Sequence, residues 1–192
     1  DALSASGHKG ITRKYPFQPG IDAAGIVAES RSKIFSEGDK VLVTGYDLGM
    51  NTDGGFGQYI RVPEDWIVKI PVNMSLRETM IYGTAGFTAG LAIYELQFNG
   101  IGPDRGKILV TGSSGGVGSL ACGMLAGIGY KVDAATSKAD DMVFWEKLGV
   151  SNVIPREEVF DKSGKPMLAG RWTGAVECVG GNTLSTVIRS IK

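Results

Sequence analysis

The sequence predicts an α/β protein in which a β-rich region precedes a doubly wound parallel sheet that is partial in this chain. Residues 23–70 carry short β-type runs separated by turn sequences, which is typical of an all-β domain. From residue 107 onward strand-like and helix-like segments alternate, which is the order of a parallel sheet with crossover helices. Glycine makes up 29 of the 192 residues, so we expect a turn-rich chain and not a helical bundle.

The first ninety residues are expected to form the β domain. Turn sequences such as Pro19-Gly20 and Asp53-Gly54-Gly55 separate its candidate strands. These strands are Ala23–Glu29, Lys40–Thr44, Gly57–Val62 and Trp66–Ile70.

Two helices are expected next. The first begins at Ser75, because Glu78 three residues later completes a capping box, and Gly83-Thr84-Ala85-Gly86 interrupts it. The second, Phe87–Phe98, ends at Asn99-Gly100. The later elements are a strand at 107–111, helix Gly116–Ile128, strand Tyr130–Ala135, helix Ala139–Leu148, strand Asn152–Ile154, a short helical stretch and strand Gly174–Cys178.

The segment 107–125, KILVTGSSGGVGSLACGML, reads as strand, glycine-rich turn and helix. Its spacing from Gly112 is G-x-x-G-G-x-G and not the usual G-x-G-x-x-G, and an ordinary tight βα turn would also hold glycines here. The βαβ unit around it favours a dinucleotide whose pyrophosphate binds the N–H groups at the helix N-terminus. The expected contacts are Ser113, Ser114, Gly115, Gly116 and Val117.

The end of the second strand indicates which dinucleotide binds. An acidic residue there would bind the adenosine ribose and repel a 2′-phosphate, whereas this chain has Thr136, Ser137 and Lys138. Two hydroxyls and an ammonium favour NADPH over NADH. Asp133 is the competing candidate, but it lies on the strand and is expected at an exposed edge or surface position. A solvated turn is the alternative interpretation of Ser137-Lys138.

Composition excludes several function classes. Twenty basic residues balance 20 acidic ones without a run of like charge, which argues against a nucleic-acid or membrane surface as partner. We find no apolar run long enough for a membrane span and no signal peptide, although Asp1 leaves an upstream targeting segment open. One histidine and two cysteines give neither a disulfide framework nor a metal cluster, so no metal is expected; His8 is expected in a solvated loop and Cys122 in the core.

Five motifs together resemble the medium-chain dehydrogenase/reductase superfamily, and most of all its quinone oxidoreductase-like branch, which includes the acrylyl-CoA reductases. They occur in the order of that superfamily and span nearly the whole chain. The motifs are PFQPGIDAAGIV (Pro16–Val27), EGDKVLVTGYDLG (Glu37–Gly49), GGFGQYIRVPEDWIVKIP (Gly54–Pro71), YGTAGFTAGLA (Tyr82–Ala92) and VTGSSGGVGS (Val110–Ser119).

The resemblance implies a GroES-like substrate domain at residues 1–90 and a Rossmann NADPH-binding domain at 91–192, with the active site in the cleft between them. It also implies that the N-terminal part of the first and the C-terminal part of the second are missing, so that this chain is an internal fragment. The complete protein is expected to be a cytoplasmic homodimer.

The resemblance also bears on the reaction. Where zinc alcohol dehydrogenases carry Gly-His-Glu, this chain reads Gly20-Ile21-Asp22, and no zinc site can be assembled from its residues. The expected reaction is zinc-independent hydride transfer from NADPH to an activated double bond, as in an enone or an acrylyl-CoA-like thioester. A quinone reductase and a non-catalytic, crystallin-like nucleotide-binding or RNA-interacting protein are the alternatives, although the balanced charge counts against RNA.

Several residues are candidates for the site, Thr88 and Arg156 from the resemblance and the others from the expected chemistry or from their position in the fold. Tyr46 is a candidate hydrogen-bond donor to the developing enolate, with an ordinary half-buried aromatic as the alternative, and Thr84 is a weaker candidate that could be only a cap. Thr88 is expected at the nicotinamide end of the cofactor. Arg156 is expected at the 2′-phosphate, unless it is a surface arginine. Gly180 and Gly181 are expected to flank the nicotinamide ribose.

Overall fold

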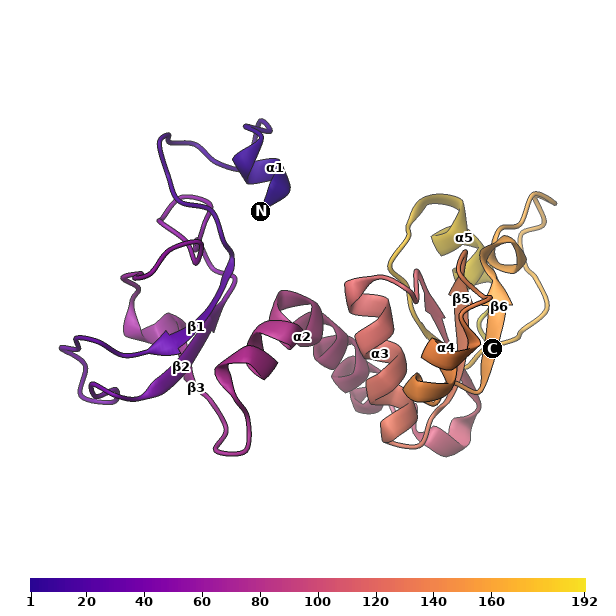
Figure 1. Cartoon of the computed structure of the whole chain (residues 1–192). Coiled ribbons are helices and arrows are strands. Elements are labelled where there is room, and N and C mark those ends of the chain that lie inside the picture. The colour runs from indigo at the N-terminus through magenta and orange to yellow at the C-terminus, as the bar shows by residue number, and fades with distance from the viewer. The chain divides into compact units, whose positions relative to one another are not determined.

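The computed structural model describes all 192 residues, which form two compact units, Asp1–Thr84 and Ala85–Lys192 (Figure 1). The expected boundary after residue 90 lies slightly further along the chain. The division falls inside helix α2 (Leu76–Phe98), because Ala89 and Ile93 of this helix are buried in the core of the second unit. No helix in the chain has both the length and the apolar character that a membrane span requires.

The first unit is built on a three-stranded antiparallel sheet of order β1-β2-β3. In its register Ala24 is opposite Leu42, and Leu42 is opposite Val68. The strands are β1 (Asp22–Ile26), β2 (Lys40–Thr44) and β3 (Ile67–Lys69), accompanied by the short helices α1 (Ala2–Ala5) and η1 (Glu64–Trp66).

The strand predicted at Gly57–Val62 is wrong, because these residues form no ladder. The segment has suitable residues for a strand, but no neighbouring strand pairs with it, and Tyr59 is 79% exposed. The preceding turn is fixed by backbone hydrogen bonds from Gly54 to Gln18 and from Gly55 to Gly20. Strand propensity without a partner leaves an extended loop.

Helix α2 begins as the sequence predicts. The Ser75 hydroxyl accepts a hydrogen bond from the Glu78 amide at 3.2 Å, and the Glu78 carboxylate accepts one from the Ser75 amide at 2.7 Å. The Ser75 hydroxyl also donates to the Glu78 carboxylate at 2.6 Å, and this bond, followed by the one from the Ser75 amide, holds the pKa of Glu78 below its usual value. The interruption is narrower than expected, since only Gly83 leaves helical geometry, at φ 48° and ψ −153°. The helix ends at Phe98, and Gly100 in the turn after it has a φ of 75°.

The second unit contains a parallel sheet of order β6-β5-β4-β7. This is the order of the first four strands of a doubly wound sheet, in which the chain runs outward from β4 and then returns to its other side. The elements are η2 (Pro103–Arg105), β4 (Lys107–Thr111), α3 (Gly116–Gly127), β5 (Lys131–Thr136), α4 (Met142–Leu148), β6 (Asn152–Pro155), η3 (Arg156–Val159), β7 (Gly174–Val176) and α5 (Gly181–Ser190).

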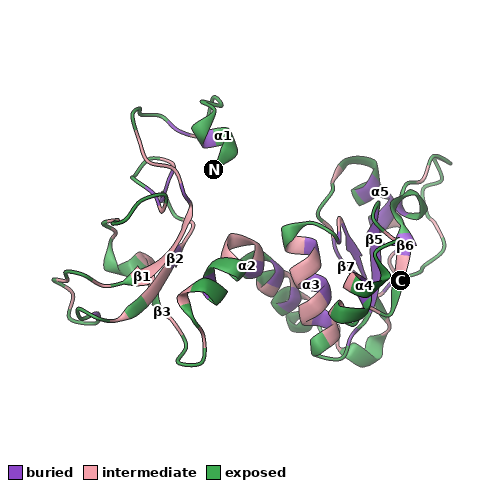
Figure 2. Cartoon of the chain, in the orientation of Figure 1, coloured by how far each residue is buried: buried purple, intermediate pink, exposed green.

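Two hydrophobic cores cover the two faces of this sheet (Figure 2). On one face, residues of α2, α3 and α4 pack against Ile108 and Val110. On the other, Leu109 packs with Val159 of η3 and Val187 of α5. Successive side chains of β4 therefore pack into the cores on opposite faces of the sheet, which explains the continuous apolar run in this strand.

Several element limits differ from the prediction. Strand β1 ends at Ile26 and not at Glu29. Helix α4 begins three residues later than expected, because Asp141 caps it by accepting a hydrogen bond from the Phe144 amide. Strand β7 ends at Val176 and not at Cys178. Helix α5 was not predicted.

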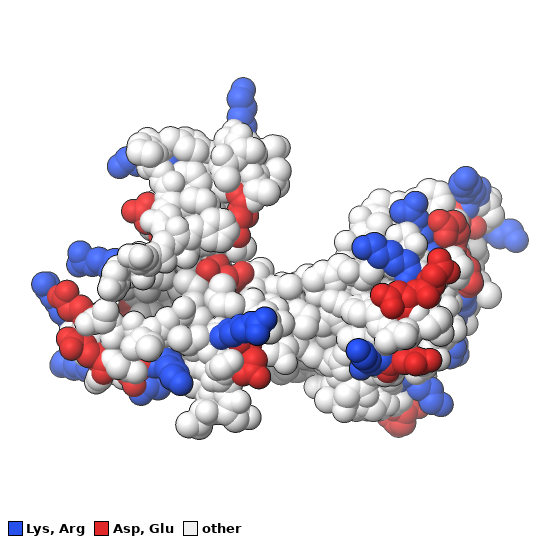
Figure 3. Space-filling model, in the orientation of Figure 1, with Lys and Arg blue, Asp and Glu red and all other residues white.

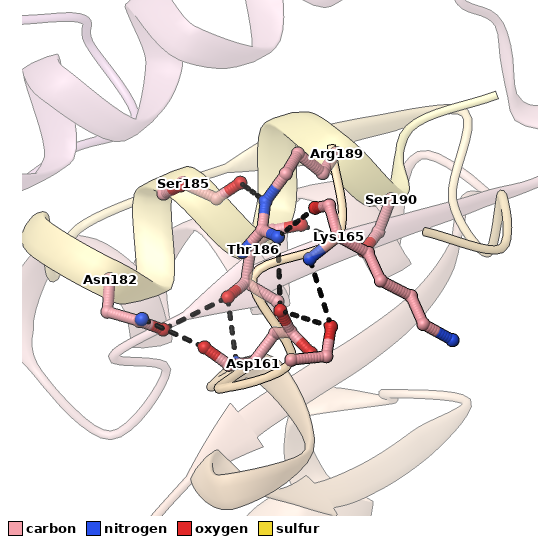
Figure 4. A network of polar contacts seen from close by, with 8 residues as sticks. Asp161, Lys165, Asn182, Ser185, Thr186, Arg189 and Ser190 are labelled. Atoms are coloured by element: carbon pink, nitrogen blue, oxygen red, sulfur yellow. Dashed lines mark hydrogen bonds and ion pairs between the residues drawn. The ribbon is translucent and has the colours of Figure 1, made fainter. Parts of the chain in front are cut away.

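A polar network joins α5 to the loop that precedes β7 (Figure 4). The guanidinium of Arg189 donates to the Asp161 carboxylate at 3.0 Å and to the Lys165 carbonyl at 2.5 Å. The Asp161 amide donates to the Thr186 hydroxyl, which in turn donates to Asn182. The network fixes a segment that has no helix or strand of its own.

Candidate functional site

The glycine loop presents the N-terminus of α3 without a cap. Gly115 is the N-cap residue, and no side chain accepts from the first turn. The amides of Gly116, Val117 and Gly118 therefore have no partner within the helix. Ser114, Gly115 and Gly116 are exposed, so an anion can reach these N–H groups.

Glycines are sterically required in this turn. A Cβ at Gly118 would lie 2.3 Å from the Gly112 carbonyl oxygen and 2.7 Å from the Ser113 Cα, and Gly112 has a φ of 57°. Ser113 is fully buried and donates its hydroxyl and its amide to the Ala135 carbonyl, at 2.9 and 3.2 Å. Ser113 thus anchors the loop to β5, and both of its donors are already used.

The carboxyl end of β5 forms a rigid turn. Thr136 is buried and accepts from the Lys138 amide at 3.0 Å, while the Trp145 indole donates to the Lys138 carbonyl at 3.0 Å. The side chains of Ser137 and Lys138 are exposed, and Lys138 forms no ion pair. Of the three residues predicted to bind the 2′-phosphate, Ser137 and Lys138 thus face solvent and Thr136 shapes the turn.

Asp133 was expected at an exposed edge, and this is wrong. It is only 4% exposed, and its carboxylate accepts from the Trp172 indole at 2.9 Å and from Lys107 at 3.1 Å. Its register partner is Leu109, so its side chain lies on the face of the sheet that Trp172 covers. Asp133 is a structural carboxylate, and β5 ends at Thr136 and not at an acidic residue. Asp140 and Asp141 follow Lys138, and Asp141 caps α4.

Arg156 stands at the carboxyl end of the neighbouring strand. Thr136 and Pro155 are register partners, so Arg156 follows β6 at the same edge where Lys138 follows β5. The Arg156 side chain is 70% exposed and pairs with Glu157 at 3.2 Å. An exposed pair of this kind is weak, and the guanidinium can exchange it for a phosphate.

Helix α2 contributes one more residue near the glycine loop. A Cβ at Gly116 would lie 3.4 Å from the Ala85 Cβ, so the start of the second part of α2 lies beside the loop. Thr88 is exposed and lies one turn further along the same helix face.

The loop after β7 contains Gly180 and Gly181, both with positive φ, and a residue that sequence reasoning missed. The carboxylate of Glu177 accepts from the Thr111 hydroxyl at 3.0 Å and from the amides of Val179 and Gly180 at 2.8 and 3.0 Å. The Gly180 amide is therefore engaged within the chain. The sequence signal that could have identified Glu177 is its position as an acidic residue between strand β7 and the pair Gly180-Gly181.

Tyr46 belongs to the first unit and has an unusual backbone. Its φ is 55°, a left-handed value that non-glycine residues seldom adopt. The ring is 57% exposed, stacks on Trp66 with 5.1 Å between ring centroids, and its hydroxyl donates to the Asp65 carbonyl at 3.3 Å. Its hydroxyl is thus accessible and held by a long hydrogen bond.

Thr84 lies next to the break in α2, where it donates to the Asp22 carboxylate at 2.9 Å. Thr44 donates to the same oxygen, and a Cβ at Gly83 would lie 3.1 Å from the other one. Asp22 thus holds the bend at Gly83 to strand β1.

Charge and potential metal ligands are dispersed. No three His, Cys, Asp or Glu side chains gather closely enough to hold a metal ion. Lys and Arg alternate with Asp and Glu on the face shown in Figure 3.

Comparison with known proteins identifies proteins with a similar sequence and architecture. Residues 1–72 match the family model of the alcohol dehydrogenase GroES-like domain. The Bacillus subtilis protein YhfP, which bears a quinone oxidoreductase name, is 45% identical over the whole chain, and the acrylyl-CoA reductase AcuI of Ruegeria pomeroyi is 40% identical over the whole chain. The match covers 58% of each of these two proteins.

Over its whole length the chain is similar to members of the medium-chain dehydrogenase/reductase superfamily.

Solved structures of this superfamily confirm the predicted GroES-like and Rossmann fold class. The yhdH oxidoreductase of Salmonella enterica, in complex with NADP, matches all of this chain and 58% of its own, with a TM-score of 0.93 and 40% identity. The yhfP structure from Bacillus subtilis, with NAD bound, matches 95% of this chain and 56% of its own, with a TM-score of 0.91 and 46% identity. The chain thus spans less than three fifths of these superfamily members.

Proposed function

We propose that the complete protein is a zinc-independent NADPH-dependent reductase that transfers hydride to an activated C=C bond of an α,β-unsaturated carbonyl compound. The observation that carries the proposal is the edge formed by the loops after β4 and β5. There the N-terminus of α3 is uncapped, β5 ends at Thr136 and not at an acidic residue, and Lys138 is exposed. This edge fits a pyrophosphate and an adenosine 2′-phosphate.

The N–H groups of Gly116 and Val117 would bind the pyrophosphate, with Ser114 and Gly115 lining its approach. Ser137 and Lys138 would bind the 2′-phosphate, joined by Arg156 once it leaves Glu157. Thr88, with Gly180 and Gly181, would lie toward the nicotinamide end. Two relatives point to different cofactors, since yhdH was solved with NADP and yhfP with NAD. Lys138 is the reason for preferring NADPH.

When bound, NADPH supplies the hydride that adds to the β-carbon of the substrate. The carbonyl oxygen then gains negative charge, and a nearby hydroxyl donor stabilises it. Tyr46 is the proposed donor, because its exposed hydroxyl can leave the 3.3 Å bond to Asp65 at small cost. The Thr84 hydroxyl is committed to Asp22, so we assign it to holding the bend at Gly83.

A quinone reductase is the second candidate, favoured by the 45% identity to the quinone oxidoreductase-named YhfP. A homodimer in the cytoplasm completes the proposal, carried over from the superfamily resemblance.

The test is turnover by the complete protein with acrylyl-CoA, crotonyl-CoA and a benzoquinone, each with NADPH and with NADH. We expect the thioesters to be reduced faster than the quinone and NADPH to be used better than NADH. Gly116→Val serves as the inactive control. Rapid quinone turnover without thioester turnover would favour the second candidate, and dinucleotide binding without any turnover would leave a crystallin-like role.

A further inference from the structure

The loop between β7 and α5 is held by a closed set of hydrogen bonds that involve Glu177 and Thr111. Thr111 is 1% exposed; its hydroxyl donates to Glu177 at 3.0 Å and accepts from the Cys178 amide at 2.9 Å. Glu177 accepts in addition from the amides of Val179 and Gly180. Three consecutive loop amides, 178 to 180, are therefore bonded to these two side chains.

This arrangement determines what the loop can offer to a ligand. With its amides occupied, the loop has no N–H groups left at 178–180 for a phosphate, and the N-terminus of α5 already faces a carboxylate. The carbonyl oxygens of Cys178 and Val179 accept no hydrogen bond within the chain. The loop therefore presents acceptors, which suit ligand groups that donate hydrogen bonds, such as a carboxamide NH₂ or a ribose hydroxyl.

Sheet topology places this acceptor surface on one side of β4, and the turn at Lys138, where the 2′-phosphate is proposed to bind, on the other side. The chain runs from β4 to β5 to β6 on one side and returns to β7 on the other, so the switch point lies between β4 and β7. A dinucleotide with its pyrophosphate at α3 and its 2′-phosphate at Lys138, after β5, extends its other half toward β7. That half contains the carboxamide and the second ribose.

We propose that Glu177 and Thr111 are positioning residues that shape the loop 178–180 into a hydrogen-bond acceptor surface for the nicotinamide half of NADPH. The inference rests on the proposed function. Because the carboxylate satisfies the loop amides before any ligand arrives, the acceptor geometry exists in the unliganded protein. The packing of Gly112 supports this, since a Cβ there would meet Val179 and Cys178 at 3.4 and 3.5 Å and the phosphate loop thus contacts the acceptor loop.

The test compares two ligands in the complete protein. NADPH reaches both halves of the site, whereas adenosine 2′,5′-bisphosphate reaches only the side near Lys138. Dissociation constants for both are measured by calorimetry for wild type, Glu177→Gln and Thr111→Val. Both substitutions keep the side-chain size. Glu177→Gln replaces one accepting oxygen by an NH₂ donor, and Thr111→Val removes the hydroxyl.

We expect each variant to bind NADPH about tenfold more weakly, while adenosine 2′,5′-bisphosphate changes by less than about twofold. Thr111→Ser, which keeps the hydroxyl, should restore most of the affinity. The double variant should lose less than the product of the single losses, because the two residues act together. Glu146→Gln, an exposed carboxylate on α4, is the matched control.

The outcomes separate the two proposals. If wild type binds neither ligand, the proposed function fails and this inference fails with it. If wild type binds both and the variants weaken both equally, or weaken neither, Glu177 and Thr111 do not position the nicotinamide half. If a variant unfolds, NADPH binding by Thr111→Ser and by Thr111→Val is compared in a thermally stable background. A packing role alone predicts that these two variants bind NADPH equally, and this result would contradict the proposal.

Discussion

The indole nitrogen of Trp172 donates a 2.9 Å hydrogen bond to Asp133, a carboxylate 39 positions earlier in the chain. Lys107 approaches the same carboxylate at 3.1 Å, and Arg171 stacks on the Trp172 ring at 4.3 Å. The acidic side chain in β5 therefore holds the connection to β7 against the sheet and does not face a ligand.

Replacing Asp133 should reduce stability and spare ligand binding. Asp133→Ala leaves the buried indole N–H without a partner, and we expect the free energy of unfolding to fall by about 2–3 kcal/mol. Urea unfolding measures this, with Lys107→Met as a milder control because Lys107 is half exposed. NADPH affinity at a temperature where the variant is folded should stay unchanged; a selective loss of NADH binding would assign Asp133 to the ribose after all.

Gly116→Val should abolish tight dinucleotide binding. The branched side chain would stand over the N–H groups of α3 and crowd Ala85, whose Cβ would be 3.4 Å from the new Cβ. We expect the dissociation constant for NADPH to rise at least about a hundredfold. Gly127→Val, at the other end of the same helix and with open space around it, is the control. An unchanged constant for Gly116→Val would disprove the pyrophosphate assignment.

Lys138→Ala should change the choice of cofactor. A charge-assisted contact to phosphate contributes roughly 1.5–3 kcal/mol, so NADPH should bind about ten- to a hundredfold more weakly while NADH binding changes little. Lys131→Ala, at the opposite end of β5, controls for the loss of charge. Equal losses for the two cofactors would show that Lys138 does not contact the 2′-phosphate.

The two thiols should differ in reactivity. Burial raises the pKa of Cys122 to about 12, and burial followed by the charge of Glu177 raises the pKa of Cys178. Only the thiolate reacts, so alkylation by iodoacetamide should be slow at pH 7 and accelerate as the pH rises, at Cys178 well before Cys122. Glu177→Gln removes the negative charge, lowers the pKa of Cys178 and should speed its alkylation at pH 8. Faster alkylation of Cys122, read by peptide mass spectrometry, would contradict the buried position.

The complete protein should contain no stoichiometric zinc, since His8 is the only histidine of this chain and Cys122 and Cys178 lie on different elements. Elemental analysis after dialysis measures this. A ratio near one zinc per chain would overturn the zinc-independent mechanism.

Features that depend on near neighbours in sequence could be predicted. The capping box of Ser75 and Glu78 and the end of α2 just before Asn99-Gly100 involve residues within a few positions of each other. The glycine loop and the exposed turn at Ser137 and Lys138 could also be predicted, because strand, turn and helix follow directly.

Features that depend on residues far apart in the sequence could not be predicted. Asp133 was misplaced because Lys107 and Trp172 are 26 and 39 positions away. The anchoring of Ser113 to β5 could not be predicted, because its acceptor, the Ala135 carbonyl, is 22 positions away. Likewise, local propensity predicted a strand at Gly57–Val62 where the sheet provides no partner.

The pairing of β7 with β4 has a consequence for folding. Thr111 and Glu177 are separated by 66 positions, whereas β4, β5 and β6 pair in chain order through short crossovers. Closing the longer loop costs more chain entropy, so the β7 contact is expected to form late and the helical crossovers early. On a ribosome the glycine loop would emerge and fold well before Glu177 is synthesised. Cofactor binding would then report the docking of β7, and a dinucleotide added during refolding would stabilise the sheet that includes β7 and leave earlier intermediates unaffected.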